Sequence, residues 1–551
     1  MPLSKQEMDW IADGIQEKHI GPETEGIAVN PKTLEGIHMI GDLQPTQAVK
    51  QWIDHQLGEE GIAISKFITP DVTEMTVEAN PDPLVTPRAS AAVQRLYSIL
   101  LDAACQGLSE EHGIGIQLQK GVALRSLNIT SEDVSKQAKS FSRAYYEYQV
   151  KNYGDKMAAA AGDHLNFSAP WRRMSPHEMT NLMVQITGRM RLLVVPLLIA
   201  LSAASPLSFG QFNGSGERMI MTPYDSTRLG KVWPGRTNMD LSTLFRNGEM
   251  FRSELENLQR DNYLLTGRDL YLPVRPQPGS IQGLPDFPET DLCFSESRDR
   301  IFALFDFGRA HSSFGEVNPY LSDDHFQKVQ SWREEYLSKF INAPRERLEV
   351  RVFETAPAFE GQTPYQHTKG LHTFAELMFI YLSQSPECVQ QLTHSEVELQ
   401  AAKSNEKAVL QGGLNARLHW IPGGMKKASA RSMLKFFLDR IQPLAKEFNR
   451  EEDLEYIREI ADGLRKTPAE MIRHEVENRY NISTERDREH MLPDDQYPKD
   501  LLIRTRKAMQ LEVEQIENDL SSLPESDQET VRTLLEVTKK LWFRMTPSSI
   551  S

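Results

Sequence analysis

The sequence contains few cysteines. Cys105, Cys293 and Cys388 are the only three among 551 residues, and no two of them form a CxxC pair. This argues against a disulfide framework or a cysteine-based zinc site and predicts a reducing compartment. The longest apolar run, residues 192–204, is too short to cross a bilayer, which needs about 20 apolar residues, and Pro196 interrupts it. We therefore expect a buried helix there and no membrane partner.

The sequence also lacks a dense run of basic residues. Its formal net charge is -15, with 62 Lys and Arg against 77 Asp and Glu, which disfavours a nucleic-acid partner. The first 19 residues are charged and amphipathic, unlike a secretion signal, so we expect a cytoplasmic protein. Gly-Ser-Gly at 214–216 lacks the Lys-Ser/Thr that completes a Walker phosphate loop, so it gives little support to that motif.

What the sequence does contain is typical of a large globular protein. Apolar residues make up 39% and charged residues 25% of the chain. Short alternating segments are separated by long helical patterns without regular βαβ alternation, which predicts an α+β fold. Residues 61–67 are expected to be a strand, and residues 87–107 and 367–385 to be helices.

The last 76 residues, 476–551, contain two segments with apolar residues at three- and four-residue spacing. This pattern predicts helices. Such helices can pack on the main domain or form a contact between copies of the chain in a homo-oligomer. The first alternative is favoured, and the second stays open.

Acidic residues alternate with other residues in two segments near the N-terminus. In HIGPETEGIAVN, Glu23 and Glu25 are two positions apart, and in VTEMTVEANP the pair is Glu74 and Glu78. Residues at i and i+2 of a strand point to the same face. Each segment should therefore present its two carboxylates on one face.

Two later segments alternate in the same way. DHLNFSAP places His164 and Asn166 on one face, and RLEVRVFET does the same with Glu349 and Arg351. If these strands adjoin, like charges repel unless a cation lies between them. Mg²⁺ and Mn²⁺ prefer oxygen ligands, and an arginine suits a transferring phosphate. Taken alone, the residues support a metal–phosphate site and a set of solvated strand faces equally.

In these segments the chain resembles the glutamate–cysteine ligase family, in particular its type-2 carboxylate–amine ligase branch. The resemblance covers roughly residues 18–475. Its motifs follow in the family's order: IGPETEG, TPDVTEMTVEANPDP, AAGDHLNFSAPW, VVPLLIALSAASPLSFGQFNGSGERM, RLEVRV and NEKAVLQGGLNA. The chain departs from the pattern where Asn166 replaces a second histidine and where Gly216 replaces a serine. No Gly-Thr precedes the segment with Glu349, and residues 260–323 look like an insertion.

The resemblance implies a curved, mostly antiparallel sheet of the glutamine synthetase type, with helices packed on one face. It implies a catalytic domain over residues 1–475 and a helical extension over 476–551. The implied reaction uses ATP with Mg²⁺ or Mn²⁺ to convert a substrate carboxylate into an acyl phosphate, which an amine then attacks. Amino acids are the implied substrates, with glutamate and cysteine first. Another amine acceptor, or a non-catalytic descendant that binds a ligand or protein, stays open.

The family also implies roles for individual residues. Arg351 would stabilise the transferring phosphoryl group and, with Asn405, contact the nucleotide. Arg218 would clamp a substrate carboxylate or phosphate, and His164 and Asn166 would bind substrate. Glu349 and Arg218 join Arg351 as the predicted catalytic residues. The expected metal ligands are Glu23, Glu25, Asp71, Glu74, Glu78, His164 and Glu349.

Overall fold

The computed structural model places a large part of the chain. It describes residues 12–70, 73, 75–120, 161–168, 186–212, 216–232, 274–277, 347–384, 396–420, 426–483, 485–486 and 488–545. Strand and helix positions below refer to these residues. No helix among them combines the length and apolar character needed to span a membrane.

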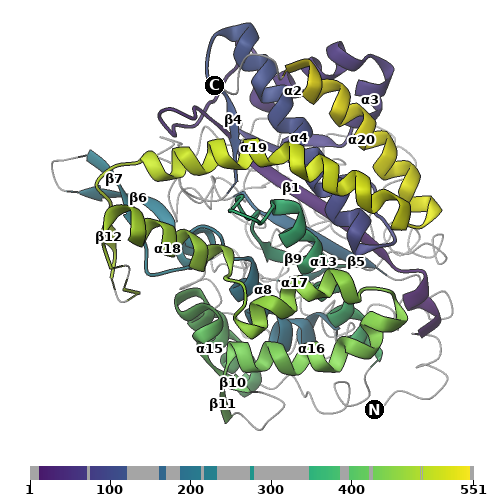
Figure 1. The fold of residues 1–551 in the computed structure, drawn as a ribbon, viewed down its shortest axis with the longest axis vertical. Coiled ribbons are helices and arrows are strands. Elements are labelled where there is room, and N and C mark those ends of the chain that lie inside the picture. Colours follow the sequence, from purple (N-terminus) through teal and green to yellow (C-terminus); the bar gives the residue numbers. More distant parts are fainter. Residues whose placement is uncertain are drawn as a thin grey trace, which may run out of the picture.

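A seven-stranded sheet forms the centre of the molecule (Figure 1). Its strands follow the order β2-β3-β1-β5-β9-β8, β4 also pairs with β1, and all the pairs are antiparallel. The strands are β1 His19–Val29, β2 Ile68–Pro70, β3 Thr76–Ala79, β4 Gln117–Gln119, β5 Asp163–Ser168, β8 Val274–Gln277 and β9 Arg347–Phe353. This arrangement confirms the predicted α+β class with a mostly antiparallel sheet. The edge strand β8 comes from the segment that was predicted to be an insertion.

Long helices cover one face of this sheet. The helix α4, Pro87–His112, lies against β1, while α13, Pro364–Gln384, lies against β5 (Figure 1). Thr86 caps α4 by accepting a hydrogen bond from the Ala89 N–H, and Pro87 occupies the first turn, where its missing N–H has no cost. Gly113 ends the helix in the left-handed conformation that favours glycine, with φ of 66°.

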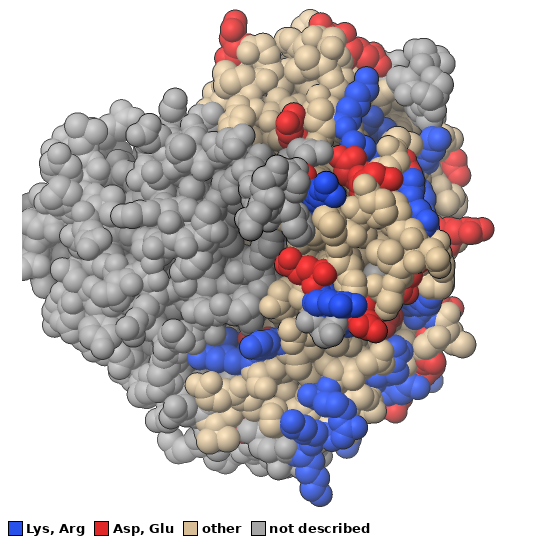
Figure 2. Space-filling view, turned by 90° about the vertical axis from the view of Figure 1, so that its left-hand side faces the viewer, with Lys and Arg blue, Asp and Glu red and all other residues tan. Residues whose placement is uncertain are grey.

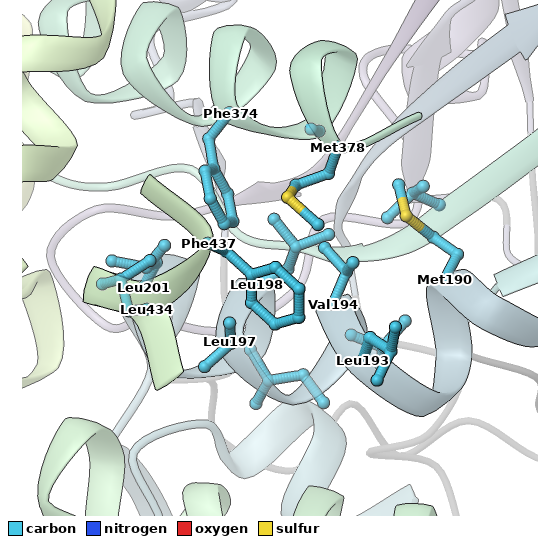
Figure 3. Close-up of a cluster of buried hydrophobic side chains, with 14 of the residues drawn as sticks. Met190, Leu193, Val194, Leu197, Leu198, Leu201, Phe374, Met378, Leu434 and Phe437 are labelled. Carbon is cyan, nitrogen blue, oxygen red and sulfur yellow. The ribbon is translucent and has the colours of Figure 1, made fainter. Parts of the chain in front are cut away.

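The predicted buried helix lies at the centre of the main core. A π-helical turn, η2 Met190–Val194, continues into α8 Val195–Ser202, and every residue of both is buried. Phe374 and Met378 of α13 point toward α8, and Leu434 and Phe437 of α16 pack on the same group (Figure 3). Burying one such side chain contributes about 1.5–3 kcal/mol. This packing fixes the helical layer behind β5 and β9.

The other elements surround this centre. Two small sheets contain β6 Leu207–Phe212, β7 Gly216–Met221 and β12 His490–Met491, and β10 Arg417–Trp420 with β11 Lys426–Ser429. The remaining helices are α2 Pro45–Leu57, α3 Glu59–Ser65, α9 Thr227–Val232, α15 Glu396–Gly412, η4 Gly413–Asn415, α16 Ala430–Glu447, α17 Glu451–Asp462, α18 Pro468–Tyr480, α19 Gln496–Asp519, η6 Leu520–Ser522 and α20 Glu525–Met545.

The C-terminal helices pack on the main domain. Both α19 and α20 contact α4, and their apolar side chains belong to the same buried cluster as those of α2 and α4 (Figure 1). Arg95 and Asp102 of α4 form ion pairs with Glu512 and Arg506 of α19, at 2.8 Å each. The division of the chain at residue 475 stays a prediction.

The strand predicted over residues 61–67 is wrong. Residues 59–65 form the short helix α3 instead, and the strand β2 begins at Ile68. Gly58, with φ of 61°, ends α2 and lets the chain turn. Glu59 and Glu60 then occupy the first turn of α3, where negative charge favours a helix N-terminus. These local signals outweigh the alternation of isoleucines.

Candidate active site

The strand register brings the predicted acidic residues together. Glu23 of β1 lies opposite His164 of β5, and Glu25 lies opposite Glu78 of β3. Along the other edge of β5, where β9 pairs with it, Asn166 lies opposite Glu349. Directly paired residues of adjacent strands point to the same face of a sheet. The polar residues of four strands therefore form a continuous stripe across one face.

Three of these side chains converge closely enough to share a cation. Glu23, His164 and Glu349 each offer one ligand atom, and these atoms lie within 4.8 Å of one another. The Nδ1 atom of His164 is 3.0 Å from Glu23 Oε2 and 3.5 Å from Glu349 Oε1. The exposed fraction of the side chain is 17% for Glu23 and 1% for Glu349. Such burial of two carboxylates is costly without a cation.

Glu25 lies on the far side of the imidazole. Its Oε1 is 3.7 Å from His164 Nε2, while its Oε2 accepts a hydrogen bond of 2.8 Å from the Gly162 N–H. The contact at Nε2 is longer than a hydrogen bond, so Glu25 acts on the imidazole through its charge. In this arrangement Nδ1 faces the two other carboxylates, and Nε2 faces Glu25.

The protonation of His164 responds to these neighbours. Burial lowers the pKa of its imidazole, but the charge of Glu25, the hydrogen bond with Glu23 and the charge of Glu349 together outweigh burial. The net effect raises the pKa above its usual value, although Arg351 opposes this. A positive charge between the carboxylates is thus favourable, and either a proton or a metal ion can supply it.

Basic and amide groups border the cluster. Arg351 Nε lies 3.2 Å from Glu349 Oε1, on the same face of β9. Asn166 donates through Nδ2 to Glu23 Oε1 at 2.7 Å and to the Gly21 carbonyl at 3.3 Å. These contacts hold Glu23 and Glu349 in place. The sequence predicts Asn166 as a substrate ligand. Its hydrogen bond to Glu23 shows that it also orients that carboxylate.

Glu78 extends the stripe toward the sheet edge. Its Oε2 accepts a hydrogen bond of 3.3 Å from Thr69 Oγ1 on β2. Asp71 and Glu74, the other predicted ligands from this segment, lie outside the described residues. The register places Glu78 beside Glu25, so a second cation between this pair would have two carboxylates available.

Two predicted residues lie elsewhere. Arg218 is exposed on β7, in the separate sheet with β6 and β12, where its Nη1 lies 3.7 Å from Met491 Sδ. The buried Asn405 of α15 exchanges two hydrogen bonds with the backbone of His419 on β10. The amide of Asn405 therefore anchors β10, and the roles predicted for Arg218 and Asn405 stay predictions.

Sequence reasoning missed Arg228. This buried residue of α9 donates through Nη1 to the carbonyls of Arg351 and Phe353, at 3.1 and 3.3 Å, and its Nη2 lies 3.5 Å from His164 Nε2. The guanidinium lies against Gly162, where a Cβ would come within 2.3 Å of Nη2. No local pattern marks Arg228, because its partners are 64 to 125 residues away along the chain.

The donor set fits a hard divalent cation. Two carboxylates and one imidazole at this spacing suit Mg²⁺ or Mn²⁺, with further coordination positions left for water or phosphate oxygens. On the face shown in Figure 2, Lys and Arg side chains are interspersed with Asp and Glu, with mostly basic residues toward the lower end.

Comparison with solved structures finds the same fold. A glutamate–cysteine ligase from Francisella tularensis, solved in complex with AMP, matches 97% of this chain and 95% of its own, with a TM-score of 0.57 at 15% identity. A bifunctional glutathione synthetase from Pasteurella multocida matches 91% of this chain at 14% identity, with a TM-score of 0.53, and 54% of that longer protein is covered. No curated protein sequence matches the chain.

A sequence model of a ligase family supplies the assignment. The model described as glutamate-cysteine ligase family 2 matches residues 174–490, more than half of the chain. The match includes β9 with Glu349 and Arg351 and begins after β1, β3 and β5. The N-terminal carboxylates and His164 precede the matched residues, and strand pairing brings them next to β9. The chain belongs to glutamate-cysteine ligase family 2.

Proposed function

We propose that this protein is an ATP-dependent carboxylate–amine ligase that joins glutamate to cysteine through an acyl phosphate. The convergence of Glu23, His164 and Glu349 beside Arg351 carries the proposal. In the reaction, the substrate carboxylate takes the γ-phosphoryl group and ADP leaves. The amine then attacks the acyl carbon, phosphate leaves, and the amine loses a proton as the amide forms.

The acidic cluster would hold the cation that this chemistry needs. Glu23, Glu349 and the Nδ1 atom of His164 are the proposed ligands, and Glu78 with Glu25 supplies oxygens for a neighbouring ion. A bound Mg²⁺ or Mn²⁺ screens the triphosphate from an attacking carboxylate and orients in-line transfer. Asp71 and Glu74 complete the proposed ligand set.

The arginines would bind the charges that move. Arg351 lies next to Glu349 at the edge of the cluster, where its planar guanidinium can donate two hydrogen bonds to a phosphoryl group. Arg218 is the proposed clamp for a substrate carboxylate, and Asn405 a contact of the nucleotide. Asn166, which already contacts Glu23, is within reach of a substrate bound over the cluster.

Release of ADP by the purified protein tests this function. We expect release to require Mg²⁺ or Mn²⁺ and glutamate, and to increase when cysteine is added. A panel of other amino acids and dipeptide amines in place of cysteine identifies the acceptor. The Arg351→Lys variant is the matched control for phosphate geometry, because it keeps the charge but loses the planar fork.

The same experiment defines the failure of the proposal. Absence of ADP release with every acid–amine pair, from a protein that binds Mn²⁺, would favour a non-catalytic, ligand-binding descendant of the family. ADP release with glutamate and a different amine would keep the ligase and replace the acceptor. Formation of γ-glutamylcysteine would assign the protein to glutathione biosynthesis.

A further inference from the structure

A buried carboxylate joins three segments of the chain next to the acidic cluster. Glu354 directly follows β9 and is 3% exposed. Its Oε2 accepts a hydrogen bond of 2.6 Å from the Ala204 N–H, and both of its oxygens lie 2.9 Å from Ser205 Oγ. Its Oε1 also accepts a hydrogen bond from the Ser226 hydroxyl. Ala204 and Ser205 follow α8 and Ser226 precedes α9, so this one side chain connects the ends of α8 and β9 with the start of α9.

Backbone hydrogen bonds reinforce the connection at the start of α9. The Thr227 N–H donates to the Ser205 carbonyl at 2.8 Å, and the Ser205 N–H donates to the Asp225 carbonyl at 3.2 Å. Ser226 Oγ accepts a further hydrogen bond of 3.0 Å from the Leu229 N–H, in the first turn of the helix. A helix of six residues is too short to be stable by its own hydrogen bonds. The contacts of Ser226 therefore help to fix the position of α9.

The residue that α9 directs toward the acidic cluster is Arg228. It is 4% exposed, and it follows Ser226 by two positions. Its guanidinium donates to the carbonyls of Arg351 and Phe353 and lies 3.5 Å from His164 Nε2. A change in the position of Ser226 is therefore expected to move this guanidinium relative to the imidazole.

Glu354 and Arg228 also interact through their charges. Burial raises the pKa of the Glu354 carboxyl more than the hydrogen bond from Ser226 and the charge of Arg228 lower it. The charge of Arg228 therefore reaches this carboxyl within the buried junction. The two residues are connected both through α9 and through space.

We propose that Glu354 is a positioning residue for the acidic cluster. It holds the start of α9 through Ser226, and α9 holds Arg228 against His164 and the carbonyls of β9. The effect of Glu354 on the cluster passes through Arg228. Its effect on the reaction rate rests on the proposed function, whereas its effect on cation binding requires only that the cluster binds Mn²⁺.

The alternative is a carboxylate that only stabilises the fold. In that case, removing it lowers the free energy of unfolding and the fraction of folded protein, but each folded molecule binds the cation as before. A positioning role instead lowers the cation affinity and the rate of each folded molecule. Denaturant unfolding gives the folded fraction, so the two roles can be separated.

Calorimetric titration of the full chain with Mn²⁺ alone is the first measurement, because it needs no substrate. Glu354→Gln keeps the shape of the side chain and removes its charge. We expect the Mn²⁺ affinity to fall about 10-fold, as it does when groups that orient metal ligands are lost. Ser226→Ala removes the hydroxyl that connects Glu354 to α9, and it should lower the affinity several-fold.

Thr227→Val is the matched control for Ser226→Ala. Thr227 is the next residue at the start of α9 and is also buried, but its hydroxyl donates to the Leu207 carbonyl, at 3.4 Å. The substitution removes a buried hydroxyl from the same helix turn without removing a contact of Glu354. It should lower stability and leave the Mn²⁺ affinity within about twofold of that of the unmodified chain.

A double-mutant cycle tests the connection through Arg228. In the Arg228→Met background, Glu354→Gln should change the Mn²⁺ affinity by less than about twofold, because the group that it positions is already absent. The kcat/KM for ADP release, measured at saturating Mg²⁺ and corrected for the folded fraction, should show the same coupling. Ser226→Ala takes the place of Glu354→Gln in both measurements if that variant does not fold.

Two results would overturn the proposal. The role of Glu354 is only structural if Glu354→Gln and Ser226→Ala lose stability but bind Mn²⁺ as the unmodified chain does. The connection through Arg228 is wrong if the effects of Glu354→Gln and Arg228→Met on Mn²⁺ affinity add in full. Coupled Mn²⁺ binding in a protein that releases no ADP would support the positioning role and overturn the proposed function alone.

Discussion

The two faces of the strands β1 and β5 carry charge in different ways. On one face, Glu23, Glu25 and Glu349 surround His164, so like charges lie within one cluster. On the helix-covered face, Asp163 contacts a lysine and two hydroxyls. Deeper in that layer, the buried charges of Arg95 and Asp102 each lie against a partner of opposite sign, Glu512 and Arg506.

The difference separates charges that hold the fold from charges that are arranged for chemistry. A one-to-one buried pair gains little net stability, but it is costly to break because the remaining charge is left unpaired. A cluster of like charges has no such purpose in a core, and perturbed ionisable groups of this kind concentrate at functional sites. Matched substitutions on the two faces should therefore have opposite effects on activity and stability.

The largest effect is expected for Glu349→Gln. Losing one of the three converging ligand atoms should lower the rate of ADP formation about 10³-fold, equivalent to about 4 kcal/mol of barrier. Stability should change less, because His164 keeps Glu23 and Glu25 as neighbours and one of several like charges is removed. Initial rates and Mn²⁺ titration check this. A variant with the rate of the unmodified enzyme would remove Glu349 from the site.

The matched substitution on the helix side is Glu512→Gln. It leaves the buried Arg95 guanidinium without its counter-charge, which should lower the free energy of unfolding by about 3 kcal/mol. The rate per folded molecule should stay within about twofold, because Glu512 is on the other face of the sheet. Denaturant unfolding and rates corrected for the folded fraction measure the two effects. A large loss of rate without a loss of stability would contradict the separation of the two faces.

The acidic face could be predicted from the sequence because a strand has a strict two-residue period. Alternation alone assigned Glu23 and Glu25 to one face, and the structure places them beside His164 and Glu78. The order of the strands is not contained in that period. The family resemblance implied a curved, mostly antiparallel sheet, and only the structure gives the order of its strands. The family match confirms the resemblance, and the α+β fold is confirmed as well.

The contacts that support the cluster could not be predicted. The positions of Arg228 and Gly162 depend on a short helix and on loops. The placement of these segments in turn depends on packing between residues far apart in the sequence. In the short helix α3, periodicity predicted the wrong element. Its isoleucines alternate as in a strand, but Gly58 and two glutamates favour the start of a helix. Periodicity identifies faces, and it gives no information on contacts between distant loops.

Arg228 tests whether the cluster depends on this support. Arg228→Met should lower kcat/KM about 10-fold, the range expected when a group that orients a ligand is lost. The reason is that Arg228 holds the carbonyls of Arg351 and Phe353 and lies beside His164. Arg228→Lys should recover part of the rate, and added guanidinium should rescue Arg228→Met. A purely structural role would lower the melting temperature and leave the rate per folded molecule unchanged.

The smallest effect concerns two histidines in the helical layer. Burial lowers the pKa of His367 to about 3, with help from the charge of Arg465. Burial also lowers the pKa of His372 to about 3, although Asp163 opposes it. His367 contacts the Tyr456 hydroxyl at 3.2 Å. Both imidazoles are therefore neutral in the folded state at pH values where the unfolded chain is protonated.

The direction in which stability changes with pH follows from proton binding. Between the unfolded pKa of 6.5 and the folded value of about 3, the unfolded chain binds more protons, so stability falls as the pH falls through this range. Each histidine should contribute up to about 1.4 kcal/mol per pH unit. Denaturant unfolding from pH 7 to 5 should give a shallower slope for His372→Gln than for His474→Gln, which removes an exposed imidazole of α18. Equal slopes would show that His372 gains its proton without unfolding.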